Sequence, residues 1–210
     1  EGGRQRLFAW GALLRMSRSG HASMSRQMGT ALNQLPDSIT NGIILLDAYR
    51  LEDAEAHLSG EDEEMRRRFD AVRPASLDET RRAIKRWIAG RARGGPMFAY
   101  AVRDVSRRLM GGCELRMRSA DSANVSYWLF PQFRGRGHAL QALDLVCGAS
   151  ERIALLNRLE VRISPDNESS RRVAEKAGFL QSGTIEEKGE MGTVSTMILY
   201  VKDVSGTENG

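Results

Sequence analysis

The stretch Gln132-Phe133-Arg134-Gly135-Arg136-Gly137-His138-Ala139 lies between a strand-like run that ends at Pro131 and a long helical pattern. Glycine lets the backbone approach a ligand closely, and the first N–H groups of a helix are free to bind an anion. Arg134 and Arg136 add guanidinium groups that form charge-assisted hydrogen bonds with phosphate oxygens. The stretch therefore predicts a site for a pyrophosphate-bearing cofactor.

Two better-known phosphate motifs do not fit this stretch. A Walker loop ends in Gly-Lys-Ser/Thr, which is absent here. A Rossmann fingerprint needs a third glycine near position 140, where this chain has Leu140, and no strand at the spacing of its acidic residue supports a dinucleotide. A plain turn at a helix start is the alternative that remains for Gly135 and Gly137.

A second stretch, about thirty residues further on, reads Pro165-Asp166-Asn167-Glu168-Ser169-Ser170-Arg171-Arg172-Val173-Ala174-Glu175-Lys176-Ala177-Gly178-Phe179. The first stretch contains the Gln/Arg-x-x-Gly-x-Gly/Ala signature of the GNAT superfamily of acyl-CoA-dependent N-acyltransferases. The second resembles that family's next motif, with its asparagine, its serine and its terminal Gly-Phe. Both motifs occur in the family's order, so residues 41–201 resemble a GNAT domain. The motifs identify the donor but not the acceptor.

The hydrophobic patterns predict an α/β fold that agrees with this resemblance. The predicted strands are 43–49, 97–103, 109–117, 124–130, 159–163, 179–186 and 193–201. The predicted helices are 51–58, 62–69, one that runs from the Ser76–Glu79 capping box to Gly90, 138–154, and a short one that Asp166 or Asn167 caps and Gly178 ends. The resemblance implies a single GNAT-like domain with a mixed, mostly antiparallel sheet. In it, a central parallel strand pair splays around the acyl-CoA site, and helices lie on both faces.

Charge divides the chain into a tail and a body. The first 36 residues hold five arginines and one acid, which accounts for the whole net charge of +4. The formally neutral body argues against nucleic acid as a partner. We expect residues 1–40 to be a basic extension, disordered or loosely attached, residues 41–203 to be the acyltransferase domain, and residues 204–210 to be a flexible tail. A targeting peptide and an added segment stay open as origins of the extension.

Other features of the composition exclude whole classes of protein. The two cysteines, Cys113 and Cys147, form neither a disulfide framework nor a metal-ligand spacing. The apolar run Leu7–Leu14 is too short to cross a bilayer. We therefore expect a cytoplasmic protein without a metal and without a membrane partner, and a homodimer stays open.

The resemblance assigns cofactor-binding residues. In the family, the pantetheine arm of the cofactor lies against an exposed strand edge, which here corresponds to Tyr127, Trp128, Leu129 and Phe130. The pyrophosphate corresponds to Arg134, Gly135, Arg136, Gly137, His138 and Ala139. Asn167 would approach the cofactor, although it serves equally well as a helix cap.

The catalytic assignments rest on fewer signals. Glu114, in the central run Gly111–Arg116, is the candidate base, because a carboxylate in a central strand is costly unless it is paired or used. The alternative is that it faces solvent or pairs with Arg116 or Arg118. Many relatives use a tyrosine to protonate the leaving thiolate, and none follows Asn167 here, which leaves Ser170 or an ordered water.

Three further groups have structural rather than chemical readings. The acidic run 61–64 either attracts a cationic amine or forms a solvated helix face, and the second is favoured. His57 and His138 are expected on the surface, although His138 is also a candidate for phosphate contact. Cys147 is expected to pack in the core.

These expectations lead to one function and two alternatives. The resemblance implies an N-acetyltransferase that moves the acetyl group of acetyl-CoA directly to an amine acceptor, either a peptide N-terminus or a small molecule. One alternative is a catalytically silent acyl-CoA sensor. The other, an RNA-associated protein that uses the Arg-rich tail, is weaker because aromatic residues are not interleaved with those arginines.

Overall fold

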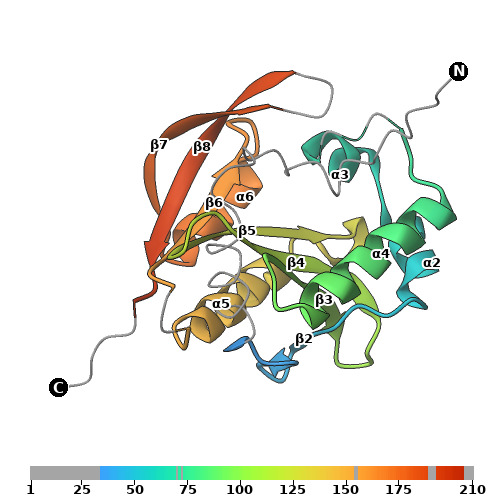
Figure 1. The fold of residues 1–210 in the computed structure, drawn as a ribbon. Coiled ribbons are helices and arrows are strands. Elements are labelled where there is room, and N and C mark those ends of the chain that lie inside the picture. Colours follow the sequence, from blue (N-terminus) through green and yellow to red (C-terminus); the bar gives the residue numbers. More distant parts are fainter. Residues whose placement is uncertain (1–33, 70, 72, 154–155, 189–192, 206–210) are drawn as a thin grey trace, which may run out of the picture.

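The computed structural model describes residues 34–69, 71, 73–153, 156–188 and 193–205. The chain forms strands and helices in an order typical of α/β domains (Figure 1). The strands are β1 (Ile39–Thr40), β2 (Ile44–Asp47), β3 (Met97–Asp104), β4 (Leu109–Met117), β5 (Ser122–Leu129), β6 (Arg158–Ile163), β7 (Leu180–Lys188) and β8 (Val194–Asp203). The α-helices are α2 (Asp53–Gly60), α3 (Glu63–Arg68), α4 (Leu77–Ala92), α5 (His138–Ser150) and α6 (Glu168–Lys176).

The strands form one sheet in the order β1-β2-β3-β4-β5-β6-β8-β7. Every neighbouring pair is antiparallel except β5 and β6, which run parallel. Only three residue pairs join these two strands, the last being Asn124 with Glu160, although each strand continues beyond it. The predicted splayed parallel pair at the centre of a mostly antiparallel sheet is confirmed.

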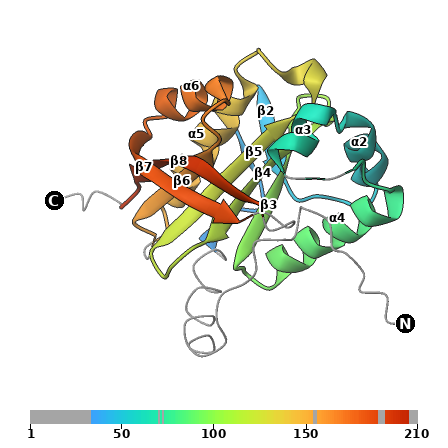
Figure 2. The same cartoon turned by 90° about the horizontal axis from the view of Figure 1, so that it is seen from above.

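Helices cover both faces of the sheet (Figure 2). On one face, the Trp87 ring of α4 lies 5.8 Å from the Trp128 ring of β5. On the other face, the Tyr127 hydroxyl of β5 contacts Ser170 of α6. Successive residues of a strand point to opposite faces. Figure 2 accordingly shows α2, α3 and α4 on one side of the sheet and α5 and α6 on the other.

Local capping signals place most helix starts where the sequence predicts them. Ser76 and Glu79 form the predicted capping box of α4. The predicted end of that helix is wrong, because α4 continues through Gly90 to Ala92. A Cβ at Gly90 would lie 3.0 Å from the carbonyl oxygen of Met97, so this glycine permits close packing against β3. α5 ends at Ser150, four residues before its predicted end.

Both ends of the described chain pack against the domain. Leu35 is buried, and the carbonyl oxygen of Pro36 accepts a hydrogen bond from the Tyr100 hydroxyl at 2.7 Å. At the other end, Val204 is buried and its N–H donates to Asn157. The rest of the predicted extension, residues 1–33, and residues 206–210 lie outside the described residues.

A buried ion cluster joins α2 to strands β2 and β3. Arg103 donates to Asp47 at 2.6 Å and to both carboxylate oxygens of Asp53 at 2.8 Å. All three side chains are buried, and a buried charge is tolerated only when it is paired and hydrogen-bonded. The cluster therefore fixes the start of α2 against the sheet.

An aromatic cluster fills the space between this corner and α4. The rings of Tyr49, Trp87, Trp128 and Phe130 surround His57, which is 2% exposed. The expectation that His57 decorates the surface is wrong, because α2 buries the face that carries Ala54, His57 and Gly60. Burial lowers the pKa of His57 to about 4.

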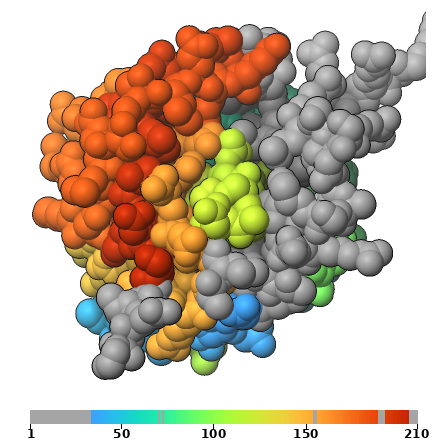
Figure 3. All heavy atoms as spheres, turned by 60° about the vertical axis from the view of Figure 1, so that its left-hand side comes forward, coloured from blue at the N-terminus to red at the C-terminus, as the bar shows by residue number. Residues whose placement is uncertain are grey.

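The outer strand β7 is exposed along most of its length. In Figure 3 the residues of β7 and β8, in orange to red, gather on one side of the molecule. No helix within the described residues has the length and hydrophobicity needed to cross a lipid bilayer.

Two glycine-to-alanine substitutions should have opposite effects on stability. A Cβ at Gly112 would overlap the Trp128 ring and the Tyr49 hydroxyl, whereas one at Gly148, on the exposed side of α5, meets nothing within 4 Å. We expect Gly112→Ala to lower the free energy of unfolding by about 1–3 kcal/mol through overpacking. We expect Gly148→Ala to raise it by about 0.5–1 kcal/mol through helix propensity. Urea titration measures both, and equal effects would contradict the packing at Gly112.

Stability should fall in acid as His57 becomes protonated. Its folded-state pKa, about 4, lies below the ordinary value of 6.5, so its contribution is present above pH 6.5 and is lost as the pH falls toward 4. The difference corresponds to about 3 kcal/mol. Urea titrations between pH 7 and 4 should show a smaller loss for His57→Phe than for the wild type. Identical pH dependence would contradict the buried, neutral state of His57.

Candidate functional site

The candidate site begins where β5 and β6 separate. The N–H of Phe130 donates to Met110 of β4 at 2.8 Å. Backbone groups of successive residues in a strand point to alternate sides, so those of Tyr127 and Leu129 point away from β4, toward β6. Within β5, residues 122–124 are the ones that pair with β6. In the described chain the backbone groups of Tyr127 therefore lie on a strand edge that has no partner strand. That edge can accept a ligand as an added strand.

The glycine turn lies directly beyond this edge. Pro131–Phe133 form a single 3₁₀ turn, and Gly135 and Gly137 follow with φ angles of +73° and +81°. These left-handed conformations explain the glycines, because a Cβ at either position would meet nothing within 4 Å. Gly137 is the N-cap of α5, and no hydrogen bond within the described chain uses the N–H groups of residues 135–140. The turn therefore presents a row of free donors at a helix start.

The two arginines of the turn lie in different surroundings. Arg136 is exposed beside the free N–H groups. The Arg134 guanidinium forms two hydrogen bonds with Asp62, at 2.7 and 2.8 Å, and a third with the carbonyl oxygen of Leu129 at 2.9 Å. These bonds lower the pKa of Asp62. Arg134 thus joins the turn to α3, and Arg136 is the arginine of the pair that can reach an anion.

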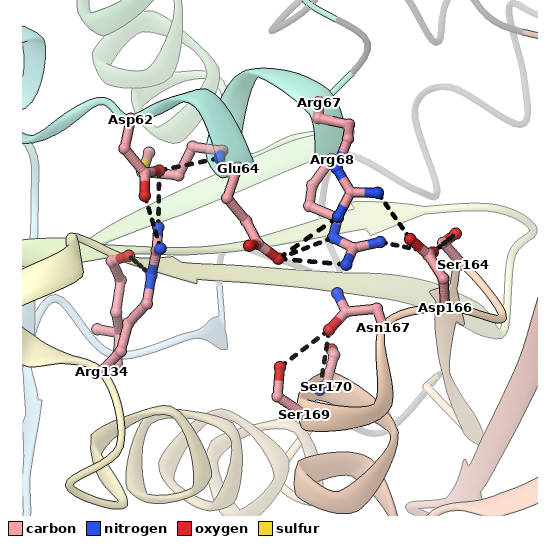
Figure 4. A network of polar contacts seen from close by, with 12 residues as sticks. Asp62, Glu64, Arg67, Arg68, Arg134, Ser164, Asp166, Asn167, Ser169 and Ser170 are labelled. Carbon is pink, nitrogen blue, oxygen red and sulfur yellow. Dashed lines mark hydrogen bonds and ion pairs between the residues drawn. The ribbon is translucent and has the colours of Figure 1, made fainter.

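Helix α3 extends from the loop after β5 to the loop after β6 (Figure 4). Asp62, its N-cap, binds Arg134 on one side. Arg67 and Arg68 bind Asp166, at 2.7 and 2.6 Å, on the other. Glu64 lies 3.2 Å from Arg68, and Glu63 and Glu64 are both exposed, so this part of the acidic run lies on the solvent-facing side of α3 with one of its acids ion-paired. Glu61 and Glu64 pair with arginines of α3 itself and Glu63 is exposed, so Asp62 is the acid of this run that ties α3 to another element.

Asn167 and Ser170 lie at the start of α6. The Asn167 side chain accepts from the N–H of Ser170 at 3.1 Å, so the predicted helix cap is present. The Ser170 hydroxyl lies 2.8 Å from the Tyr127 hydroxyl, which also donates to the Ser170 carbonyl oxygen at 3.1 Å. Burial raises the pKa of Tyr127, so its phenol stays protonated.

The neighbours of Tyr127 in β5 face different surroundings. Trp128 packs in the aromatic cluster on the opposite face, as strand alternation predicts. Leu129 and Phe130 are buried, and the Phe130 ring packs directly against Gly60. Their side chains belong to the core, so only backbone groups of these residues can contribute to a cofactor site. His138 and Ala139, in the first turn of α5, are half-buried.

Glu114 is buried in β4 and paired. Both Nε and Nη2 of Arg116 donate to one oxygen of Glu114, at 3.1 and 2.8 Å, which is one of the alternatives open from the sequence. Burial raises the pKa of Glu114, whereas Arg116 and a hydrogen bond from Trp87 oppose that shift. A carboxyl with a raised pKa can take a proton from an ammonium group, so the base role stays a prediction.

The cysteines and the other potential metal-ligating side chains form no second site among the residues that the structure describes. Cys147 and Cys113 are both buried, and burial raises the pKa of the Cys147 thiol to about 12, so it acts as a packing residue. Among the residues that the structure describes, no three His, Cys, Asp or Glu side chains are placed to hold a metal ion.

Sequence reasoning missed two contacts of the site. Asp62 lies 72 residues before Arg134, and Tyr127 lies 43 residues before Ser170. No local spacing signals either pair, because folding brings separate elements together. The alternation of Tyr127 and Trp128 along β5 was the one available indication that their side chains lie on different faces.

Comparisons with known proteins agree with this geometry. The family model described as an acetyltransferase (GNAT) domain matches residues 44–180. A GNAT-family acetyltransferase from Bacillus anthracis has a similar structure, with a TM-score of 0.69, 17% identity, and 80% of this chain and 98% of that chain covered. A putative ribosomal-protein-serine acetyltransferase from Vibrio cholerae has a TM-score of 0.68 and 18% identity, with 79% of this chain and 97% of that chain covered. RimJ from Mycobacterium smegmatis, in complex with CoA-disulfide, has a TM-score of 0.64 and 20% identity, with 81% of this chain and 88% of that chain covered.

A comparison with curated proteins finds no match. At these identities the structural neighbours show the fold, and the family model, which spans more than half of the chain, shows the family. The splayed parallel strands, the glycine turn at the start of α5 and the match over residues 44–180 agree with one another. This chain belongs to the GNAT acetyltransferase family.

Proposed function

We propose that the protein is an acetyl-CoA-dependent N-acetyltransferase that moves the acetyl group directly to a primary amine. One observation carries this proposal: the unpaired edge of β5 leads straight into the row of free N–H groups at residues 135–140. An extended amide-containing arm followed by a diphosphate has the chemical pattern that matches this sequence of donors and acceptors.

The cofactor is bound mainly through the backbone. The N–H and C=O groups of Tyr127 pair with the amides of the pantetheine arm as a strand would. The N–H groups of residues 135–140 and the Arg136 guanidinium hold the pyrophosphate at the positive end of α5. Asn167 supports this site by capping α6, where its side chain lies beside Ser169 and Ser170 (Figure 4).

The reaction needs a base, a stabilised oxyanion and a proton donor. Glu114 removes the proton from the attacking ammonium group. The N–H of Leu129, which points away from β4, would stabilise the negative charge that develops on the thioester oxygen. Ser170 donates a proton to the sulfur as the carbon–sulfur bond breaks. No covalent enzyme intermediate is required, because the amine attacks the thioester itself.

The acceptor is a peptide N-terminus or a small-molecule amine. Two similar structures are named for ribosomal-protein acetylation or as RimJ, and another is named spermidine N-acetyltransferase, so both acceptor classes occur among relatives of this fold. In this chain three acids of the run 61–64, namely Glu61, Asp62 and Glu64, are paired with arginines, which reduces the negative charge that could attract a polyamine.

A catalytically silent acyl-CoA-binding module is the second candidate. One observation favours it: Arg116 and Trp87 already engage the Glu114 carboxylate, which therefore has to give up a partner before it can act as a base. Thiol release from acetyl-CoA, measured over a panel of amines and peptide N-termini, separates the two. Binding without release for every acceptor supports the module.

Cofactor binding should depend on Arg136. We expect CoA to raise the melting temperature of the wild type, and Arg136→Glu to reduce that shift by more than half, because the new carboxylate repels the diphosphate. Arg152→Glu is the matched control, since it makes the same charge change beyond the other end of α5 and should keep the full shift. No shift for the wild type at millimolar CoA would reject the cofactor assignment.

Glu114→Gln should remove the base. We expect kcat to fall by about a hundredfold or more. The wild-type kcat/KM should rise with pH through the Glu114 pKa, which burial places above its ordinary value, because only the carboxylate accepts a proton. The variant should lack that rise. Glu160→Gln, in an ion pair with Arg162 on β6, is the control and should stay within about threefold of the wild type. An unchanged pH–rate profile for Glu114→Gln would remove Glu114 from the mechanism.

A further inference from the structure

We propose that Tyr127 is a positioning residue that orients the Ser170 hydroxyl toward the sulfur of the bound thioester. This inference rests on the proposed function, in which Ser170 protonates the leaving thiolate. It assigns a second task to Tyr127, whose backbone already faces the opening between β5 and β6.

The Tyr127 hydroxyl forms its hydrogen bonds within the described chain with Ser170. The two hydroxyl oxygens lie 2.8 Å apart, and the Tyr127 hydroxyl is 3.1 Å from the Ser170 carbonyl oxygen. Tyr127 belongs to the middle of β5, where it pairs with Cys113 of β4, so its ring is held by the sheet. The contact thus connects the edge of β5 to the first turn of α6.

A serine hydroxyl needs such a contact to donate a proton reliably. Its O–H rotates freely, and its oxygen is stable as a donor only when another group directs it. The phenol carries a single proton, so it donates either to the Ser170 carbonyl oxygen or to the Ser170 hydroxyl oxygen. In the proposed step it donates to the hydroxyl oxygen, which leaves the serine's own proton free for the sulfur. The Asn167 cap holds the Ser170 N–H at the same time, so both the backbone and the hydroxyl of Ser170 are fixed.

The phenol is suited to this role because it keeps its proton. Burial raises the pKa of Tyr127 above its ordinary value, so it remains a donor throughout the working pH range. Negative charge that develops on the Ser170 oxygen is stabilised by the phenol and by the positive end of α6. A phenol from β5 therefore supports the proton donor in a helix that has no tyrosine after Asn167.

The protons and electrons of the step balance. The carbon–sulfur bond breaks, its electron pair moves to sulfur, and the Ser170 oxygen transfers its proton to form the thiol. The Ser170 oxygen regains a proton from water, while Tyr127 keeps its own. The proton that the amine loses passes through the base to water, so the products are the amide and CoA.

A double-mutant cycle tests the coupling. We expect Tyr127→Phe and Ser170→Ala each to lower kcat by about tenfold or more, with the KM for acetyl-CoA changed less than twofold. In the Ser170→Ala background, Tyr127→Phe should have no further effect, because Tyr127 acts through Ser170. Tyr100→Phe is the control: its hydroxyl donates to the carbonyl oxygen of Pro36 at 2.7 Å, and its effect should be small and independent of Ser170.

A second measurement does not depend on an acceptor. A Ser170 hydroxyl aimed at sulfur stabilises the thiolate of bound CoA, so ultraviolet titration of that thiol should give a pKa about half a unit or more lower in the wild type than in Tyr127→Phe. If this difference appears but no amine is acetylated, the proposed function fails and the positioning role stands. If the wild type transfers acetyl groups but Tyr127→Phe changes neither kcat nor the thiol titration, the positioning role is wrong. If CoA does not bind, both are wrong.

Discussion

The early end of the β5–β6 pairing is the constraint on which the site depends. Three residue pairs align two parallel strands, and beyond Asn124 and Glu160 the strands separate. Parallel neighbours normally continue to exchange hydrogen bonds, so the separation leaves backbone groups of β5 available to a ligand. β5 ends at Leu129 and α5 begins at His138, and the 3₁₀ turn and the glycine turn form the connection between them. One stretch of chain therefore supplies the unpaired strand edge, the free N–H groups of the glycine turn and the N-terminus of α5.

Charge pairing keeps the surrounding elements in place. The Arg103 cluster fixes α2 on one side of the sheet, and α3 is tied by arginine–carboxylate bonds to the loops after β5 and β6. The partly exposed pairs of α3 are individually weak, but they act at both ends of a short helix. Together they tie the two loops to opposite ends of one helix.

Features encoded by neighbouring residues could be predicted from the sequence. The Ser76–Glu79 capping box, the bounds of β4 and the turn at Gly135 and Gly137 follow from local chemistry, and the structure contains each of them. The order of elements and the two motifs were sufficient for the fold and the family.

Features that depend on distant contacts could not be predicted. A glycine such as Gly90 is typical of a helix end, yet Gly90 is an interior residue of α4, and the backbone of β3 approaches it closely. His57 lies on a short, polar helix, and its position is buried by aromatic side chains from α4, from β5 and from the segments that follow β2 and β5. The partners of Arg134 and Tyr127 are likewise set by tertiary packing, so the chemical role of a motif residue was harder to foresee than its location.

The exposed outer strand β7 has a consequence for association between molecules. An uncovered strand is a template on which another chain can add hydrogen bonds and extend the sheet. Here the register shifts between Gln181 and Gly183, and the strand ends in Glu186, Glu187 and Lys188. The register shift makes β7 irregular, and its charged end repels the same strand of another molecule. Both features oppose the addition of further copies of the chain to the edge of the sheet.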